Sequence, residues 1–482
     1  MVGITSYGAY IPRYRINRGV VYQAMGWLNP ATFMGGEKAV AHYDEDSVTM
    51  SVAASIDCLT GMDRKKIDGA YFATTTSPYK ERQCAEIIAT ALDLRSDIRT
   101  ADLTDSVKSG TTALISALDA VKAGSAKNTL VCAADCRIGK AGSVQEQIFG
   151  DGGASLVVGD SGVIASFEGS HSVSYDFVDH WRGDGQNFDR QWEDRFIRDI
   201  AYGRFIPEAI SGLAEKCRLD VKDIAKLAYP CLYAGDHKKI AKKLGLDPAQ
   251  VQDPMLNNVG YTGTSNPLML LVAALEDAKA GDNIVVVSFG NGSDALLFKV
   301  TDEIEKIKAD RRGIKKHLAA RRELASYEKF VSFRNTIPVE KGIRGDTMAP
   351  TALSELWRSR RQVLGLVGSK CKKCGTPQFP AQLVCVKPDC GVIGEMEDYS
   401  FSDKKATLFT YTGDMLAFSM NPPAIYGIVD FEGGGRYWFD MTDADQEDVK
   451  VDMPVEMSFR KKYVDENTGT HGYFWKTIPV IE

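Results

Sequence analysis

The order of apolar and polar residues in the first 300 positions predicts the same group of elements twice. Residues 117–124 (ALDAVKAG) and 274–281 (ALEDAKAG) each have the pattern of a helix ending at a glycine, which tolerates a positive φ. A short apolar run follows each of them, LVCAAD and IVVVSFG, and such runs between turn residues are typical of strands in a covered sheet. A second matching pair, FGDGGASLVV and FGNGSDALLF, comes next. We therefore predict an internally duplicated α/β domain with halves at residues 1–165 and 166–345.

The pattern changes after residue 400, where short strands with alternating or aromatic character predominate. They read ATLFTYTGDML, AIYGIVDFEGG, RYWFDMTD, PVEMSFRKKYV and GYFWKTIPVI, and Gly, Asp and Asn turns separate them. This spacing predicts a small β-barrel of the oligonucleotide/oligosaccharide-binding (OB) type over residues 396–482. Upstream, the charged stretch 304–334 predicts an exposed helix, and the segment from Thr351 predicts a helix with Thr351 as its N-cap.

Four cysteines form two close pairs between the predicted helix and the predicted barrel. Cys371 and Cys374 make one pair, Cys385 and Cys390 make the other, and ten residues separate the two pairs. Two tight turns that bring four thiolates together are typical of a tetrahedral zinc site, and a site of four thiolates leaves no position for a catalytic water. We predict a structural Zn²⁺ in a ribbon over residues 346–395.

Composition narrows the possible functions of the chain. The 482 residues suggest two or three domains, and the net charge of −6 gives no electrostatic footprint for nucleic acid. The acidic stretch DADQEDVKVD in the barrel also argues against nucleic acid. The apolar runs are all shorter than the ~20 residues of a membrane span, and the start has no signal-peptide pattern. We expect a cytoplasmic protein with no membrane partner, in which the other six cysteines are reduced thiols.

Four motifs in the duplicated part resemble the thiolase superfamily. They are GAYIPRYRI at residues 8–16, DHWR at 179–182, KKLGLD at 242–247 and FGNGSDALLF at 289–298. The resemblance is strongest to hydroxymethylglutaryl-CoA synthases of the archaeal and bacterial type, over residues 1–340. Residues 345–482 resemble the zinc-ribbon and barrel proteins that accompany such thiolases as separate subunits. The resemblance implies a five-layer αβαβα domain, a coenzyme A thioester as substrate, and either a homodimer or a complex with a catalytic thiolase.

The resemblance also shows which catalytic residues have changed. The synthases carry a nucleophilic Cys in a segment like DLEFACKAGT, and the matching segment DLTDSVKSGT places Val107 there. The general acid/base Glu of the family corresponds to Thr75, its His to Pro230, and the Asn that polarises the thioester carbonyl to Tyr261. Valine cannot form a thioester, so acyl transfer through a cysteine is not expected in this domain.

Three interpretations remain open. In the first, the pocket binds an acyl-CoA and makes or breaks a C–C bond by an aldol-type mechanism, with Tyr261 as the acid/base residue and Ser106, Thr75 and His237 around it. In the second, the domain is a non-catalytic subunit that docks a separate thiolase and channels acyl-CoA. In the third, it is a hydroxymethylglutaryl-CoA synthase or acyltransferase whose catalytic residues lie elsewhere in the chain.

Three more residues are candidates for binding rather than chemistry. His180 and Arg182, in DHWR, would line the CoA entrance, and Asn291 would line the active cavity. Ser106 also suits the N-cap of a helix over residues 107–120. The strand LVCAAD is the expected edge through which the domain self-associates.

Overall fold

The computed structural model describes residues 1–342, 345 and 350–481, and it contains two compact units. Unit 1 comprises Met1–Ala41, Asp46–Ala85 and Arg95–Phe330, and unit 2 comprises His42–Glu45, Glu86–Leu94 and Val331–Glu482. The predicted boundary at residue 345 lies beside residues 343–344 and 346–349, which are outside the described part of the chain. In the described ranges, no helix is long and apolar enough to cross a membrane.

Unit 1 contains the predicted duplication. Four strands of each half follow the same order with the same relative directions, so β4-β6-β7-β1 is repeated as β11-β12-β13-β8. The strands of the first half are β4 (Gly69–Ala73), β6 (Asn128–Asp135), β7 (Gly152–Gly159) and β1 (Gly3–Tyr10). Those of the second are β11 (Ile224–Ala228), β12 (Asn283–Val287), β13 (Gly292–Val300) and β8 (Ala165–Ser174).

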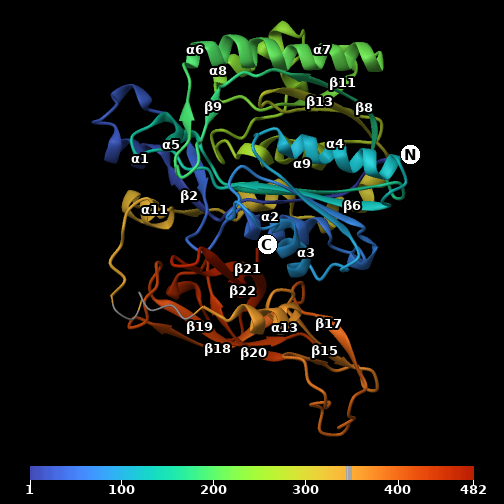
Figure 1. Ribbon diagram of the computed structural model, residues 1–482, viewed down its shortest axis with the longest axis vertical. Helices are drawn as coiled ribbons and strands as arrows, with labels where there is room; N and C mark the ends of the chain where they lie inside the picture. The colour runs from blue at the N-terminus through green and yellow to red at the C-terminus, as the bar shows by residue number, and fades with distance from the viewer. Residues whose placement is uncertain (343–344, 346–349, 482) are drawn as a thin grey trace. The chain divides into compact units, whose positions relative to one another are not determined.

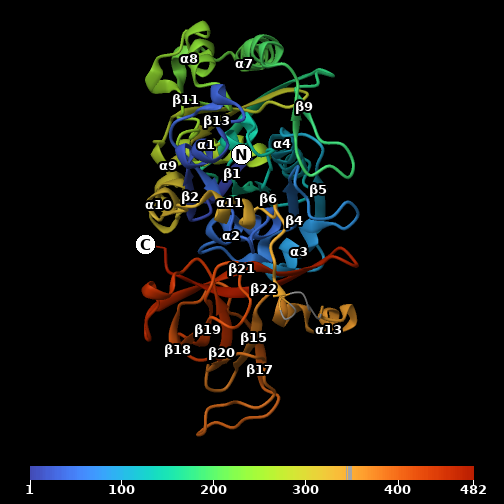
Figure 2. The same cartoon turned by 90° about the vertical axis from the view of Figure 1, so that its left-hand side faces the viewer.

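Helices form three further layers around the two half-sheets (Figure 1). The helices α4 (Ser109–Lys122) and α9 (Asn266–Asp277) pack on each other between the half-sheets. The outer layers include α2 (Ser47–Cys58) and α7 (Ile206–Cys217), which pack on the first and the second half-sheet. Every residue of α9 from Asn266 to Leu275 is buried, as expected for a helix that is apolar all round. The five-layer αβαβα fold is therefore confirmed, and Figure 2 shows the same layers from the side.

The predicted edge strand is wrong. LVCAAD lies in β6, which pairs with β4 on one side and β7 on the other. The edge of the first half is β5 (Arg99–Leu103), which pairs with β4 only. Apolar character reports burial of both faces of a strand, and β6 has helices over both of its faces, so its composition carries no information on edge position.

Three helix predictions also differ from the structure. The charged stretch is not one helix but consists of η7 (Asp302–Lys306), η8 (Lys308–Asp310), α10 (Gly313–Ala319), β14 (Arg322–Glu323) and α11 (Tyr327–Phe333). The helix after residue 350 is α13 (Leu353–Val363), and its N-cap is Ala352 rather than Thr351. Likewise, the N-cap of α4 is Lys108 rather than Ser106.

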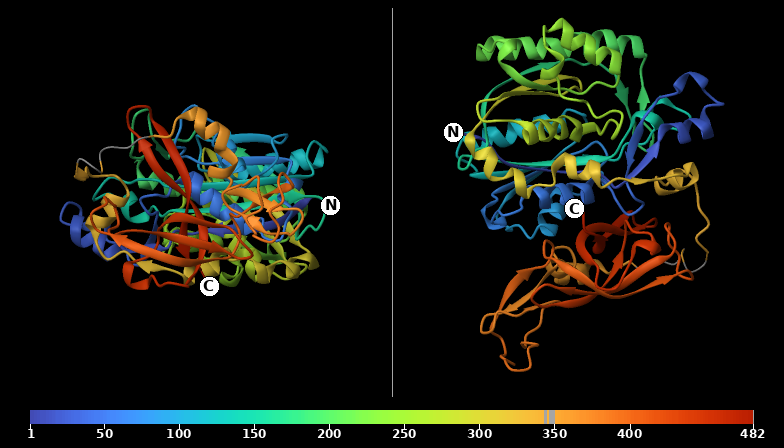
Figure 3. Two further views of the ribbon diagram at one scale, coloured as in Figure 1. Left: turned by 90° about the horizontal axis from the view of Figure 1, so that it is seen from below. Right: turned by 180° about the vertical axis from the view of Figure 1, so that it is seen from behind.

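Unit 2 contains the predicted barrel and ribbon. Five strands close the barrel in the order β18-β19-β20-β22-β21, and they are β18 (Ala406–Asp414), β19 (Ala424–Phe431), β20 (Arg436–Met441), β21 (Pro454–Asp465) and β22 (Thr470–Pro479). Its interior includes the buried side chains of Leu408, Val429, Phe439 and Trp475. The ribbon is a three-stranded sheet of β15 (Val367–Cys371), β16 (Pro377–Gln378) and β17 (Met396–Ser400), and its loop extends away from the barrel (Figure 3).

Candidate active site

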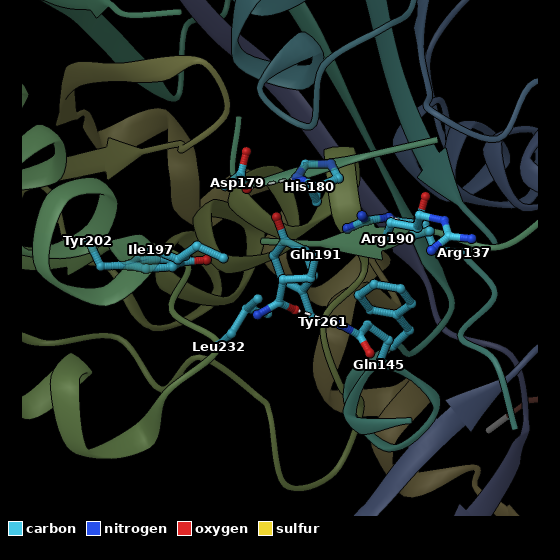
Figure 4. A pocket seen from close by; sticks show the side chains of 12 residues that line it. Arg137, Gln145, Asp179, His180, Arg190, Gln191, Ile197, Tyr202, Leu232 and Tyr261 are labelled. Carbon is cyan, nitrogen blue, oxygen red and sulfur yellow. Dashed lines mark hydrogen bonds and ion pairs between the residues drawn. The ribbon is translucent and has the colours of Figure 1, made fainter. Parts of the chain in front are cut away.

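A pocket lies in unit 1, beside the two-stranded ribbon of β9 (His180–Trp181) and β10 (Arg190–Gln191). Figure 4 shows the twelve side chains that line it, and most of them are polar or charged. They are Arg137, Gln145, Phe149, Asp179, His180, Asp189, Arg190, Gln191, Ile197, Tyr202, Leu232 and Tyr261. A concave site with several converging titratable groups is the usual form of an active site.

Tyr261 is held in this pocket by backbone contacts with the loop before β7. Its N–H donates to the Ile148 carbonyl at 2.8 Å, and its carbonyl accepts from Gly150 N at 3.1 Å. The loop comes so close that a Cβ on Gly150 would lie 1.8 Å from the Val259 carbonyl oxygen, so only glycine fits there. Burial raises the pKa of the Tyr261 phenol well above its ordinary value. The phenol therefore stays protonated at neutral pH and can act as a hydrogen-bond donor.

A buried ion pair forms the wall next to Tyr261. Arg137 Nε lies 2.8 Å from Asp189 Oδ2, and the side chains are 4% and 5% exposed. The Arg137 guanidinium also lies over two aromatic rings, 4.3 Å from the Phe149 centroid and 5.7 Å from the Tyr261 centroid. Burial lowers the pKa of Arg137, but the charges of Asp189, Tyr261 and Asp135 and the hydrogen bond to Asp189 together raise it overall. The pocket thus contains a permanent, partly compensated positive charge beside the phenol.

His180 and Asp179 form a second polar pair in the pocket. His180 Nδ1 lies 2.7 Å from Asp179 Oδ2, and the side chains are 22% and 12% exposed. The Asp179 carboxylate is also close enough to raise the pKa of both Tyr261 and Tyr202, after the larger effect of burial. An imidazole oriented by a carboxylate is a common arrangement for proton transfer.

Thr75 lies behind the pocket in a network centred on the buried Asp135. The Asp135 carboxylate accepts hydrogen bonds from Thr75 N and Oγ1 at 2.7 and 3.0 Å, and from Thr264 N and Oγ1 at 2.8 and 2.9 Å. Gly263 has a φ of +61°, and a Cβ there would lie 2.2 Å from Asp135 Oδ2. Arg182 donates to the Thr75 carbonyl, and its Nη1 lies 3.6 Å from Asp189 Oδ1. Thr75 and Arg182 therefore contact the pocket wall without lining the pocket.

Val107 lies just before α4, at the position where the resemblance places the nucleophile of the synthases, and it is buried. Val107 is 2% exposed, and a Cβ on Gly290 would lie 3.0 Å from Val107 Cγ2. Ser106 Oγ donates to the Gly290 carbonyl at 3.3 Å and accepts from Lys108 N at 3.3 Å. Lys108 Nζ in turn lies 3.4 Å from Asp294 Oδ1. Ser106 thus shapes the turn before α4 and does not line the pocket.

Two other predicted residues also lie away from the pocket lining. His237 is on α8 (Ala234–Lys243), 6% exposed and stacked on Tyr229 with centroids 4.2 Å apart. Burial lowers the pKa of His237 to about 4. Asn291 is exposed and donates to the Phe177 carbonyl at 3.5 Å. Among the seven predicted catalytic and binding residues, Tyr261 and His180 line the pocket together.

Sequence reasoning missed Arg137, Asp179, Asp189 and the hub residue Asp135. The position of two of them at the end of an apolar strand could have indicated their role, since Asp135 ends β6 and Arg137 follows shortly after it. Binding sites in α/β domains often lie at the carboxyl ends of strands. Asp189 is 52 residues from Arg137 in sequence, and only the tertiary structure joins them.

The zinc ligands converge as predicted. The Sγ atoms of Cys371, Cys374, Cys385 and Cys390 all lie within 4.8 Å of one another. Cys371 and Cys390 are 3.8 Å apart, and Cys374 and Cys385 are 3.5 Å apart. Sulfurs around a tetrahedral Zn²⁺ with bonds of ~2.3 Å lie about 3.8 Å from each other. The four cysteines therefore have the geometry of a structural zinc site.

Three protein families match separate parts of the chain. The family described as "3-Oxoacyl-[acyl-carrier-protein (ACP)] synthase III C terminal" matches residues 214–299. "ChsH2, rubredoxin-like zinc ribbon domain" matches residues 358–392, and "ChsH2, C-terminal OB-fold domain" matches residues 400–460. These matches agree with the second half of the duplicated domain, the ribbon and the barrel.

Known proteins also resemble about two thirds of the chain. The hydroxymethylglutaryl-CoA synthase of Methanocaldococcus jannaschii is 33% identical over 347 residues, which cover 70% of this chain and 99% of that protein. The synthase of Methanopyrus kandleri is 34% identical over 315 residues, or 64% of this chain and 90% of that protein.

Solved structures show the same fold. An HMG-CoA synthase crystallised with CoA aligns with a TM-score of 0.62 at 17% identity, over 73% of this chain and 94% of that one. The 3-oxoacyl-[acyl-carrier-protein] synthase III of Aquifex aeolicus VF5 aligns with a TM-score of 0.54 at 19% identity, over 62% of this chain and 100% of that one. The chain therefore belongs to the hydroxymethylglutaryl-CoA synthase family of the thiolase superfamily, and it carries a zinc ribbon and an OB-fold barrel in the same polypeptide.

Proposed function

We propose that this protein binds an acyl-CoA and makes or breaks a C–C bond next to the thioester by an aldol-type mechanism, without an acyl-cysteine intermediate. The observation that carries the proposal is the pocket itself, which combines a protonated phenol (Tyr261), a carboxylate-oriented imidazole (His180) and a buried guanidinium (Arg137). The relatives named hydroxymethylglutaryl-CoA synthase, and the related fold solved with CoA, support a CoA thioester as the ligand class.

Two buried cysteines of unit 1 fit a mechanism without a thiolate. None of the twelve pocket residues is a cysteine. Burial raises the pKa of Cys84 to about 11, and burial also raises the pKa of the fully buried Cys132. A thiol of raised pKa carries little thiolate at neutral pH and is a weak nucleophile.

The proposed reaction needs only proton transfers and stabilisation of an oxyanion. In the direction of bond formation, a base removes a proton from the carbon beside the thioester carbonyl, and the C–H electron pair forms an enolate. The enolate carbon adds to the carbonyl carbon of the second substrate, and the new alkoxide takes a proton from the Tyr261 phenol. The proton held by the base returns to the phenolate through solvent, so no group leaves and no redox partner is needed. The positive charge of Arg137 favours both oxyanions because it lies beside the phenol in a water-poor site.

The test is cleavage and formation of β-hydroxyacyl-CoA by the purified full chain, measured by liquid chromatography and mass spectrometry. Hydroxymethylglutaryl-CoA and 3-hydroxybutyryl-CoA are suitable first probes. Tyr261→Phe should lower turnover on the order of 10²-fold while CoA still binds, as expected for loss of a proton donor. Tyr22→Phe is the matched control, because its exposed hydroxyl donates to the Pro30 carbonyl outside the pocket. Treatment with iodoacetamide should leave turnover unchanged.

A second candidate function is a non-catalytic subunit that docks a separate thiolase and channels acyl-CoA. The burial of Val107, at the position where the resemblance places the nucleophile of the synthases, favours it. Turnover only in the presence of a co-encoded thiolase would support this candidate. A hydroxymethylglutaryl-CoA synthase reaction would instead require an acyl label on a cysteine, which can be detected by mass spectrometry of tryptic peptides.

A further inference from the structure

The ribbon of β9 and β10 places a histidine where the proposed reaction needs a base. His180 and Gln191 are paired in register on the ribbon, and both line the pocket. The Asp179 carboxylate lies 2.7 Å from His180 Nδ1. A carboxylate at this distance favours the proton on Nδ1, so that Nε2 becomes the acceptor, and it stabilises the imidazolium that forms when Nε2 takes a proton.

Several charged groups line the pocket together with His180. Asp179 precedes it on the chain, and Asp189 and Arg190, at the start of β10, line the same pocket. Arg137 also lines the pocket, and Asp189 at 2.8 Å balances its charge. Two phenols, those of Tyr261 and Tyr202, complete the titratable surroundings (Figure 4).

We propose that His180, oriented by Asp179, is the base that removes the proton from the carbon next to the thioester carbonyl. This inference rests on the proposed function, and it assigns to His180 a chemical role instead of a place at the CoA entrance. The C–H bond breaks, its electron pair becomes the enolate, and the proton moves to His180 Nε2. Tyr261 and Arg137 stabilise the enolate oxygen, because the phenol is protonated and the guanidinium lies 5.7 Å from the phenol ring centroid.

The test follows this proton directly and needs no knowledge of the second substrate. The full chain is incubated in D₂O with acetyl-CoA, propionyl-CoA or 3-hydroxybutyryl-CoA, and deuterium at the α-carbon is measured by mass spectrometry. His180→Gln should lower the exchange rate at saturating thioester by 10²-fold or more, whereas the dissociation constant for CoA should change less than threefold. Asp179→Asn should lower the rate by at least tenfold with His180 still in place.

Two further measurements separate chemistry from structure. Imidazole added to His180→Gly should restore part of the exchange, because a free base can occupy the space of the lost ring, and a purely structural role would give no rescue. His171→Gln is the matched control, since His171 lies on β8 of the same unit and does not line the pocket. This variant should exchange at the wild-type rate.

The possible failures are distinguishable. Wild-type exchange that persists within threefold in His180→Gln would overturn the role of His180 and leave the proposed function standing. Weaker CoA binding in that variant, with an unchanged rate at saturation, would return His180 to a binding role and overturn the inference as well. No exchange by the wild type with any of the three thioesters would overturn the proposed function itself.

Discussion

Replacing Asp189 with Asn should destabilise unit 1, because it removes the closest carboxylate of a buried arginine. Arg137 Nε lies 2.8 Å from Asp189 Oδ2, and both side chains are at most 5% exposed. The substitution keeps the size of the side chain and removes its charge. The guanidinium keeps its stacking on Phe149 and Tyr261, so the change isolates the charge of Asp189.

The expected size follows from the burial of the pair. Two opposite charges about 4 Å apart attract by ~4 kcal/mol at an effective dielectric constant of 20, and removal of one partner of a buried pair commonly costs 3–5 kcal/mol. Asp135 still acts on Arg137, and it raises the pKa of the guanidinium together with Asp189. Because this charge remains, we expect the lower end of the range, about 3 kcal/mol.

Urea unfolding monitored by tryptophan fluorescence measures the effect. With a slope of ~3 kcal/mol/M, a loss of 3 kcal/mol moves the midpoint of the unit 1 transition by about 1 M. Asp184→Asn is the matched control, since Asp184 lies between β9 and β10, is 79% exposed and pairs with Lys80 on the surface. It should leave the midpoint unchanged.

A double substitution tests the reasoning further. Arg137→Met combined with Asp189→Leu removes both charges and should recover much of the lost stability, because the buried guanidinium is removed together with its carboxylate partner. An Asp189→Asn midpoint within 0.2 M of the wild type would refute the reasoning. It would show that the remaining groups compensate Arg137 without Asp189.

Three further predictions concern other parts of the chain. Cys374→Ser should lower the zinc content from about one ion per chain, measured by plasma mass spectrometry, and should destabilise unit 2. The control Cys217→Ser should change neither the zinc content nor the stability. A well-folded wild-type protein without zinc would contradict the zinc site in the ribbon. Burial lowers the pKa of His237 to about 4 from 6.5, so the unfolded chain binds its proton more readily than the folded chain does. The stability from neutral His237 is thus fully present above pH 6.5 and is lost as the pH falls to about 4, a loss of roughly 3 kcal/mol. His237→Gln should abolish this loss. If the unfolding free energies of the wild type and of His237→Gln fall in parallel with pH, the prediction is refuted. Finally, the edge strand β5 should allow unit 1 to self-associate, so sedimentation of a stable monomer at micromolar concentration, without a partner, would count against pairing there.

The local patterns of the sequence determined the fold class. The repeated order of helix, strand, Gly-rich turn and strand predicted the duplication, because apolar runs and glycines with positive φ, such as Gly124 at +71°, specify elements through short-range physics. Zinc ligation was predictable for the same reason, since two tight turns bring Cys371, Cys374, Cys385 and Cys390 together over 20 residues. The sequence also shows Val107 where the resemblance places a cysteine nucleophile, and a valine favours a mechanism without a thiolate.

Only the tertiary structure decided which polar residues share a site. Tyr261 and His180 are 81 residues apart in sequence, and Arg137 meets Asp189 through a ribbon whose two short strands carry no clear periodicity. His237 and Ser106 were equally plausible from their residue types, but burial against Tyr229 and hydrogen bonding in the turn before α4 keep them out of the pocket lining. The edge position of β5 could not be predicted from the sequence either. The residues of a strand indicate whether its faces are buried, but they do not indicate which strand pairs with it. Long-range pairing and the desolvation of charges depend on the whole fold, and no local pattern in the sequence reports them.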